Sequence, residues 1–164
     1  MKLRTERLDI LPLDVDMLRL LLDDMPGLEA RLGCIYRGEP IEGEFRRIVA
    51  SQYEIVLYDS ANYLWHSFWL LIRRDDGTVV GSADFKAPPD KLGRVEIGYG
   101  LGAQFERRGY MTEAADAMCR WALGQENVKN VVAETENGNL ASQRVLRRCG
   151  FRELSQGATK WWIL

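Results

Sequence analysis

The fold is decided by a stretch that reads Arg94-Val-Glu-Ile-Gly-Tyr-Gly-Leu101, then Gly109-Tyr-Met-Thr-Glu-Ala-Ala-Asp-Ala-Met-Cys-Arg-Trp-Ala-Leu123, and then Asn130-Val-Val-Ala-Glu-Thr135. The first and third runs have the residue types and lengths of strands, whereas the middle run places small and apolar side chains on one face of a helix. A strand, a helix and a second strand in this order predict a β-α-β unit with parallel strands and a right-handed crossover.

Outside this unit, strand-like and helix-like segments follow one another. Two β-rich runs, 68–72 and 78–85, flank a turn that contains Asp76-Gly77 and predict a hairpin. Pro40 is expected to start a helix that ends near Asp59. The other expected elements are strands at 3–12, 151–154 and 159–164 and helices at 15–22, 28–32 and 140–148. This order of elements indicates an α+β (mixed α/β) class with a mixed sheet.

The composition is that of an average globular protein. The chain has 164 residues, of which 46% are hydrophobic and 28% charged, which predicts one domain over residues 1–164 and excludes disordered and fibrous classes. A formal net charge of −2 gives no general attraction for nucleic acid or an anionic membrane, and no apolar run is long enough to span a bilayer. Residues 1–7 lack the apolar core of a signal peptide, so a cytoplasmic location is expected.

The numbers and spacing of cysteine and histidine residues limit which disulfide or metal sites the chain can form. The three cysteines, Cys34, Cys119 and Cys149, are odd in number and irregular in spacing, which favours neither a disulfide framework nor a metal site. His66 is the single histidine, so a metal site with two histidine ligands is excluded. We expect a structural role for His66.

Two glycine-containing segments follow the first strand of the β-α-β unit. Residues 98–103 match the dinucleotide fingerprint G-x-G-x-x-A, but the helix begins only near Gly109 and no acidic residue stands at position 118, so we interpret these glycines as a strand bulge. Residues 104–114 lead directly into the helix. Unpaired backbone N–H groups at a helix start can hold a pyrophosphate, although a glycine-started helix without a ligand fits this segment equally well.

A more specific pattern follows the unit. Residues 139–151 read Asn-Leu-Ala-Ser-Gln-Arg-Val-Leu-Arg-Arg-Cys-Gly-Phe and match N-x-x-S-x-x-V-L-x-x-x-G-F at every specified position. Together with Glu96-Ile-Gly-Tyr99, Gly109-Tyr-Met-Thr-Glu-Ala114 and the opening Thr5-Glu-Arg-Leu8, this segment resembles the GNAT superfamily of acyl-CoA-dependent N-acetyltransferases. The resemblance is greatest to the branch that includes the ribosomal-protein alanine acetyltransferases, and it covers nearly the whole chain except residues 34–64.

The resemblance implies a GNAT-like acyl-CoA N-acyltransferase fold. Its central sheet is mostly antiparallel, and one parallel strand pair splays apart to receive acetyl-CoA as co-substrate. The family's CoA-binding positions correspond to Tyr99, Gly100, Leu101, Arg107, Arg108, Gly109, Tyr110, Met111, Thr112, Asn139 and Ser142. Arg107 departs from the pattern, because the family's loop has its first glycine there, and this departure bears on loop shape and CoA affinity.

Glu96 is the candidate general base. By strand alternation it shares a face with Gly98 and Gly100, where a carboxylate would face the cleft and burial would raise its pKa. Such a base is useful because an amine must be neutral to attack the thioester. The alternative is a purely structural carboxylate paired with Arg94 or another arginine.

Ser142 is the candidate residue for protonating or hydrogen-bonding the thiolate that leaves from acetyl-CoA. Many family members use a tyrosine seven residues after the motif asparagine, but Leu146 occupies that position here, and the branch that this chain resembles implies the serine instead. The alternative is that Ser142 only bonds the helix backbone. Asn139 is expected to cap the same helix.

The resulting prediction is an enzyme that moves an acetyl group from acetyl-CoA to a primary amine by direct attack in a ternary complex. The acceptor is a protein N-terminus, as in the ribosomal branch, or a small-molecule amine, and a CoA-binding module without turnover is the rival from another class. The family also suggests a homodimer. Residues 24–64, which would shape the acceptor pocket, match no motif.

Overall fold

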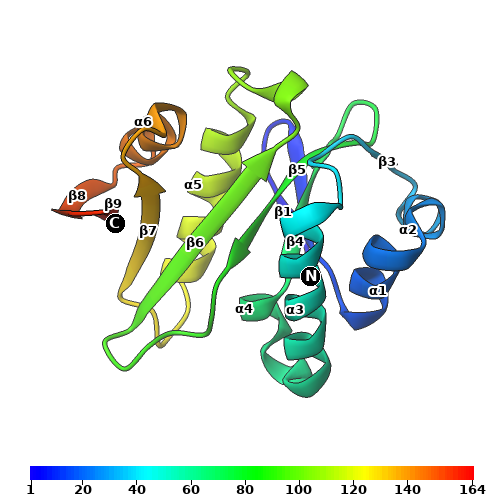
Figure 1. Cartoon of the computed structure of the whole chain (residues 1–164), viewed down its shortest axis with the longest axis horizontal. Coiled ribbons are helices and arrows are strands. Elements are labelled where there is room, and N and C mark those ends of the chain that lie inside the picture. Colours follow the sequence, from blue (N-terminus) through cyan, green and yellow to red (C-terminus); the bar gives the residue numbers. More distant parts are fainter.

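The computed structural model, which describes residues 1–164, contains one nine-stranded sheet with the order β1-β2-β4-β5-β6-β7-β9-β8 (Figure 1). The strands on this path are β1 (Leu3–Arg4), β2 (Leu8–Pro12), β4 (Phe68–Arg73), β5 (Thr78–Phe85), β6 (Arg94–Leu101), β7 (Asn130–Glu136), β8 (Arg152–Gln156) and β9 (Thr159–Ile163). The short β3 (Ile35–Tyr36) lies parallel to the start of β5. All neighbours on the path are antiparallel except β6 and β7, so the predicted parallel pair is confirmed.

Helices cover both faces of the sheet. They are α1 (Val15–Asp23), α2 (Met25–Leu32), α3 (Gly43–Tyr58), α4 (Tyr63–His66), α5 (Tyr110–Leu123) and α6 (Leu140–Arg148), with single 3-10 turns at Ser60–Asn62 and Ala103–Phe105. Because strand side chains alternate, Trp69 packs with α5 in one hydrophobic cluster and Leu70 packs with α1 and α3 in the other. No helix is long and apolar enough to cross a membrane.

The expected N-terminal strand is divided in two. Thr5 forms a tight turn, in which its N–H donates to Leu8 O (2.9 Å) and its hydroxyl accepts from Leu8 N–H (3.0 Å). The second helix begins at Met25 rather than at Leu28, because the Asp24 side chain accepts a hydrogen bond from Gly27 N–H (3.0 Å) and caps it. Sequence periodicity alone does not reveal these side-chain hydrogen bonds.

The parallel strands β6 and β7 separate along their length. Their pairing stops at Glu96 and Val132, and Figure 1 shows the two strands diverging beyond that point, with α5 behind the widening gap. The other edge of β6 stays in register with β5 as far as Leu101, so the predicted glycine bulge is wrong. The glycines instead leave room for side chains from other segments, because Glu39 occupies the space beside Gly100.

Candidate active site

Backbone donors of β6 face the gap between the two parallel strands. Lys86 N–H donates to Glu96 O (3.0 Å) and Gly102 N–H donates to Val80 O (2.9 Å), so the even-numbered residues of β6 turn their backbone groups toward β5. The odd-numbered residues therefore turn theirs toward β7. Because β7 has already diverged, the N–H groups of Tyr99 and Leu101 are left without a strand partner and point into the gap.

A cavity of ≈ 500 Å³ opens at this gap. Its lining comes from the end of β6, from the loop and first turn of α5, and from one face of α6 with its cap Asn139. The lining residues are Tyr99, Gly100, Leu101, Glu106, Arg107, Gly109, Met111, Thr112, Asn139, Ala141, Ser142, Arg144, Val145 and Arg148. Three arginines and a helix N-terminus therefore surround a space next to unpaired backbone donors, and this arrangement suits a long ligand that carries phosphates.

The helix start at this cavity has the features of an anion-binding site. Gly109, with φ +80°, precedes α5, and no side chain caps the helix, so its first-turn N–H groups stay available. Arg107 adopts φ +61° and is the only residue other than glycine with positive φ. The arginine thus takes up the left-handed conformation that glycine adopts freely, and its substitution for glycine does not prevent the turn.

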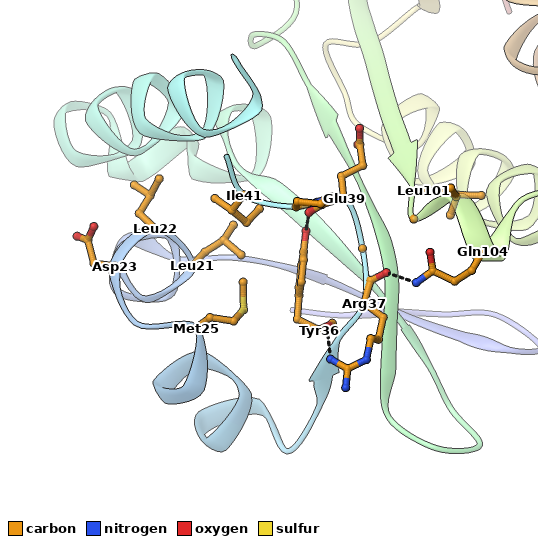
Figure 2. Close-up of a pocket in the computed structure, with 14 residues that line it drawn as sticks. Leu21, Leu22, Asp23, Met25, Tyr36, Arg37, Glu39, Ile41, Leu101 and Gln104 are labelled. Carbon is orange, nitrogen blue, oxygen red and sulfur yellow. Dashed lines mark hydrogen bonds between the residues drawn. The ribbon is translucent and has the colours of Figure 1, made fainter. Parts of the chain in front are cut away.

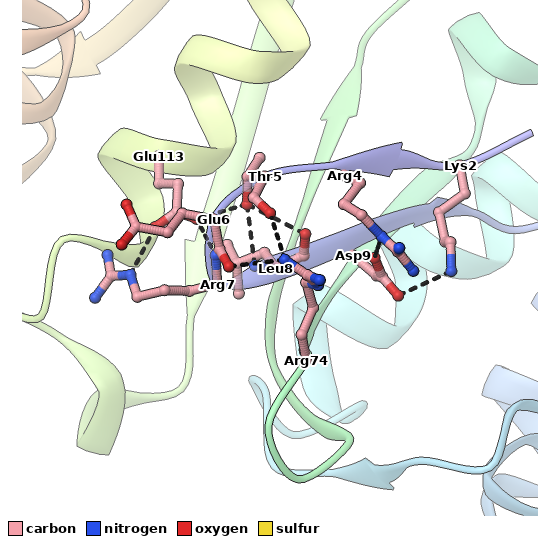
Figure 3. Close-up of polar contacts among 9 residues, drawn as sticks. All are labelled: Lys2, Arg4, Thr5, Glu6, Arg7, Leu8, Asp9, Arg74 and Glu113. Carbon is pink, nitrogen blue, oxygen red and sulfur yellow. Dashed lines mark hydrogen bonds and ion pairs between the residues drawn. The ribbon is translucent and has the colours of Figure 1, made fainter.

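The N-terminal turn holds this loop in place (Figure 3). The Glu113 carboxylate, in the first turn of α5, accepts hydrogen bonds from Thr5 Oγ1 (2.5 Å), Arg7 N–H (2.8 Å) and Arg7 Nε (2.7 Å). Arg7 in turn donates to Arg108 O (2.9 Å) and lies over the Tyr110 ring. These bonds hold the pKa of Glu113 below its ordinary value, against the opposing effect of burial.

Two hydroxyl groups meet at the cavity wall. Tyr99 Oη lies 2.9 Å from Ser142 Oγ, which joins β6 to the first turn of α6. Asn139 caps this helix as predicted, because its side chain accepts from Ser142 N–H (3.1 Å). Burial raises the pKa of Tyr99 to about 12, so the phenol remains protonated at neutral pH and can donate a hydrogen bond.

Glu96 lies on the opposite face of β6 from Tyr99 and is half-buried. The carboxylate forms no hydrogen bond or ion pair, and Arg94 pairs with Asp90 (3.0 Å) instead. Burial raises the pKa of Glu96, as predicted. The nearby charges of Glu134 and Asp84 raise it further, whereas Lys86 acts against them.

A second cavity, of ≈ 920 Å³, lies beyond the end of β6 (Figure 2). It is lined by the end of α1 and the start of α2, by residues 36–41 from the end of β3 onward, and by residues 101–104. Part of the segment that matched no motif therefore forms the wall of a cavity. Leu101 lines both cavities, so the two meet at the end of β6.

Most of the sequence-predicted residues come together. Every predicted CoA-binding residue except Arg108 and Tyr110 lines the first cavity. Arg108 is exposed and Tyr110 is buried against Arg7. His66 bonds Asp59 (3.0 Å) away from both cavities, which agrees with a structural role.

Other lining residues were not predicted as site residues. Arg144 and Arg148 lie outside the loop before α5, and only the placement of α6 brings them to the first cavity. Residues 36–41 carry no periodic signal that would have marked a second cavity.

Comparisons with known proteins agree with this geometry. The sequence matches the acetyltransferase (GNAT) domain family over residues 22–152. It is 32% identical over 162 residues to the uncharacterized N-acetyltransferase YjdG of Bacillus subtilis, a match that covers 92% of this chain and 96% of that one.

Solved structures of other acetyltransferases share the fold. The ribosomal-protein-S5-alanine acetyltransferase of Vibrio fischeri superposes with a TM-score of 0.71 at 14% identity, over 100% of this chain and 96% of that one. RimL, a ribosomal α-N-protein acetyltransferase solved in complex with coenzyme A, superposes with a TM-score of 0.68 at 18% identity, over 100% of this chain and 97% of that one.

Proposed function

The chain belongs to the GNAT family of N-acetyltransferases, and on that premise we propose that it transfers the acetyl group of acetyl-CoA to a primary amine by direct attack in a ternary complex. The observation that carries this proposal is the first cavity, where an uncapped helix N-terminus lies beside backbone N–H groups that have lost their strand partner. We also propose that residues 1–164 act as a single domain.

The first cavity has the donor set that acetyl-CoA requires. The N–H groups of Tyr110, Met111 and Thr112 at the start of α5 would hold the pyrophosphate, and Arg107 would pair with a phosphate group. Asn139 would contact the pantetheine arm, since it lines the cavity at the start of α6. Arg108 would contribute charge from the loop's exposed side.

Acetyl-CoA supplies an activated acyl group, and the protein supplies hydrogen bonds and a base. The N–H groups of Tyr99 and Leu101 would donate to the carbonyl oxygen as it gains negative charge, because they point into the gap. Glu96, directly or through a water molecule, would take the proton that the ammonium group must lose before it attacks. The raised pKa of Glu96 suits this role, because it brings the base closer to neutrality.

The bond changes balance with these groups. The amine nitrogen forms a bond to the acyl carbon, the carbon–sulfur bond breaks, and the electron pair leaves on sulfur. The nitrogen gives up its second proton and the sulfur takes up one proton, so the products are an amide and free CoA thiol. Ser142 Oγ would donate a hydrogen bond to that sulfur, and the Tyr99 hydroxyl would support it by donating to Ser142 Oγ across 2.9 Å. Tyr99 thus provides a second hydroxyl in a site where Leu146 leaves the family's usual tyrosine position without one.

A protein N-terminus is the acceptor that we propose first, because two proteins of the same fold are named as ribosomal-protein acetyltransferases. An α-amine also loses its proton more readily than a lysine amine, with pKa values near 7.7 to 8 against about 10.4. A small-molecule amine is the second candidate. A panel of amines that includes N-terminal peptides of ribosomal proteins, assayed by release of free CoA thiol, distinguishes the two.

The test of the mechanism is the pH dependence of turnover in Glu96→Gln. This variant should bind CoA normally in a calorimetric titration. The fall in kcat/KM that we expect for the wild type at low pH should move to higher pH in the variant, because only acceptor molecules that have already lost a proton in solution can then attack. Glu134→Gln should shift that fall to lower pH, because the Glu134 charge helps to raise the pKa of Glu96. An unchanged profile in Glu96→Gln would remove Glu96 from the mechanism, and absence of CoA binding by the wild type would overturn the proposal as a whole.

A further inference from the structure

The second cavity combines an apolar wall with one unpaired carboxylate (Figure 2). Its apolar lining includes Leu21, Leu22, Met25 and Ile41. Figure 2 shows the Glu39 carboxylate directed away from the leucine side chains of α1.

Glu39 lies where a side chain on residue 100 would be. A Cβ atom added to Gly100 would collide with Oε2 of Glu39 and would lie 2.8 Å from its Cδ. The glycine therefore makes room for the carboxylate against the backbone of β6. Because Gly100 and Leu101 line the first cavity, this carboxylate reaches the place where the two cavities meet.

The Glu39 carboxylate has no cationic partner in the protein. Asp23, the other acidic residue of the lining, pairs with Arg46 (3.0 Å), and Arg37 donates to the Tyr36 carbonyl (2.9 Å). Glu39 makes neither a hydrogen bond nor an ion pair through its side chain, although it is half-buried. Its backbone is fixed nonetheless, since Tyr36 Oη donates to Glu39 O (2.8 Å). A half-buried carboxylate without a partner is unfavourable, and a bound cation would compensate for that cost.

We propose that the second cavity is the acceptor site, that it takes a primary amine attached to an apolar body, and that Glu39 binds the ammonium group of this amine beside Gly100. The inference rests on the proposed acetyl transfer, because it assigns the second substrate of that reaction. Glu39 and Glu96 lie over the same face of β6, so the bound ammonium group and the proposed base are on one side of the strand.

The lining also defines what the site should reject. Glu39 is the only carboxylate of the cavity that lacks an ion pair, so the site offers one anchoring charge next to an apolar wall. A polyamine would place its further charges against apolar surface, which costs free energy. An amine with a single charge and an alkyl or aromatic body is therefore the better fit.

The test compares hexylamine, leucinamide and spermidine as acceptors for the full chain at saturating acetyl-CoA. Glu39→Gln should raise KM for hexylamine about ten- to a hundredfold, as expected for loss of a charge-assisted contact, and leave the Kd for CoA unchanged. Glu39→Asp keeps the charge and should give an intermediate KM. Glu42→Gln, an exposed carboxylate three residues away, serves as the matched control and should behave as the wild type.

The outcomes separate the two proposals. If the wild type acetylates amines but Glu39→Gln has the wild-type KM, or if spermidine is preferred to hexylamine, the acceptor inference is overturned and acetyl transfer stands. If the wild type releases no thiol with any amine, the proposed function itself fails. Preference for leucinamide over hexylamine would support a peptide N-terminus as the source of the amine, and the reverse would support a free amine.

Discussion

Replacing Glu113 with glutamine tests whether the N-terminal turn stabilises the loop that we propose to bind the phosphates of CoA. The Glu113 side chain is 17% exposed and accepts three hydrogen bonds, two of them from groups of Arg7. Hydrogen bonds to a charged group contribute about 1.5 to 3 kcal/mol each, but the Arg7 side chain is 42% exposed and its share is closer to that of a surface ion pair. Glutamine keeps one acceptor oxygen, so we expect the free energy of unfolding to fall by about 2 kcal/mol, equivalent to about 4 to 8 °C in Tm.

The pH dependence of this effect has a definite sign. The pKa of Glu113 in the folded protein lies below its ordinary value of 4.5, so the carboxylate stabilises the fold at pH values above 4.5 and loses this effect as the pH falls through the folded pKa. The difference between wild type and Glu113→Gln should therefore be largest at neutral pH and shrink in acid.

Urea unfolding at several pH values measures the stability, and a calorimetric titration measures CoA affinity. Affinity should fall with stability, because Arg7 also bonds the carbonyl of Arg108 within the loop. Asp116→Asn is the matched control, since Asp116 lies on the same helix and pairs only with the exposed Arg120. Wild-type stability and CoA affinity in Glu113→Gln, or a stability loss that persists unchanged in acid, would refute the reasoning.

Two further substitutions test the loop and the hydroxyl pair. Arg107→Gly should raise the free energy of unfolding by about 0.5 to 1 kcal/mol, because the left-handed conformation is strained for arginine and the gain is partly offset by the flexibility of glycine when unfolded. The same variant should bind CoA more weakly, and repeating the titration with dephospho-CoA shows whether the lost contact is to the 3′-phosphate. Tyr99→Phe should lower kcat up to about tenfold at unchanged CoA affinity, since it removes one hydrogen bond to Ser142 Oγ. In the double variant with Ser142→Ala, the effects of the two substitutions on the free energy of activation should not add. Full additivity would mean that the two hydroxyls act separately.

Patterns in the sequence were sufficient to predict those features that depend only on residues close together in the chain. The alternation of residues 94–101, the apolar face of residues 110–123 and the Asn139 cap each depend on neighbours within a few positions, and each is confirmed. The uncapped start of α5 belongs to the same class, because the first backbone N–H groups of a helix lack partners within the helix itself. The boundaries at Thr5 and Asp24 were not predicted, because at each of them a single side-chain hydrogen bond sets where a strand or helix begins.

The sequence by itself therefore determined the class of fold, the family and the loop that suits a phosphate. Only the tertiary structure decided which N–H groups of β6 are free, because that depends on where β7 diverges. It also brought Tyr99 to Ser142, from positions 43 residues apart, and laid Glu39 against Gly100. These contacts join segments that no local pattern links, since they arise when separate elements pack against the same strand.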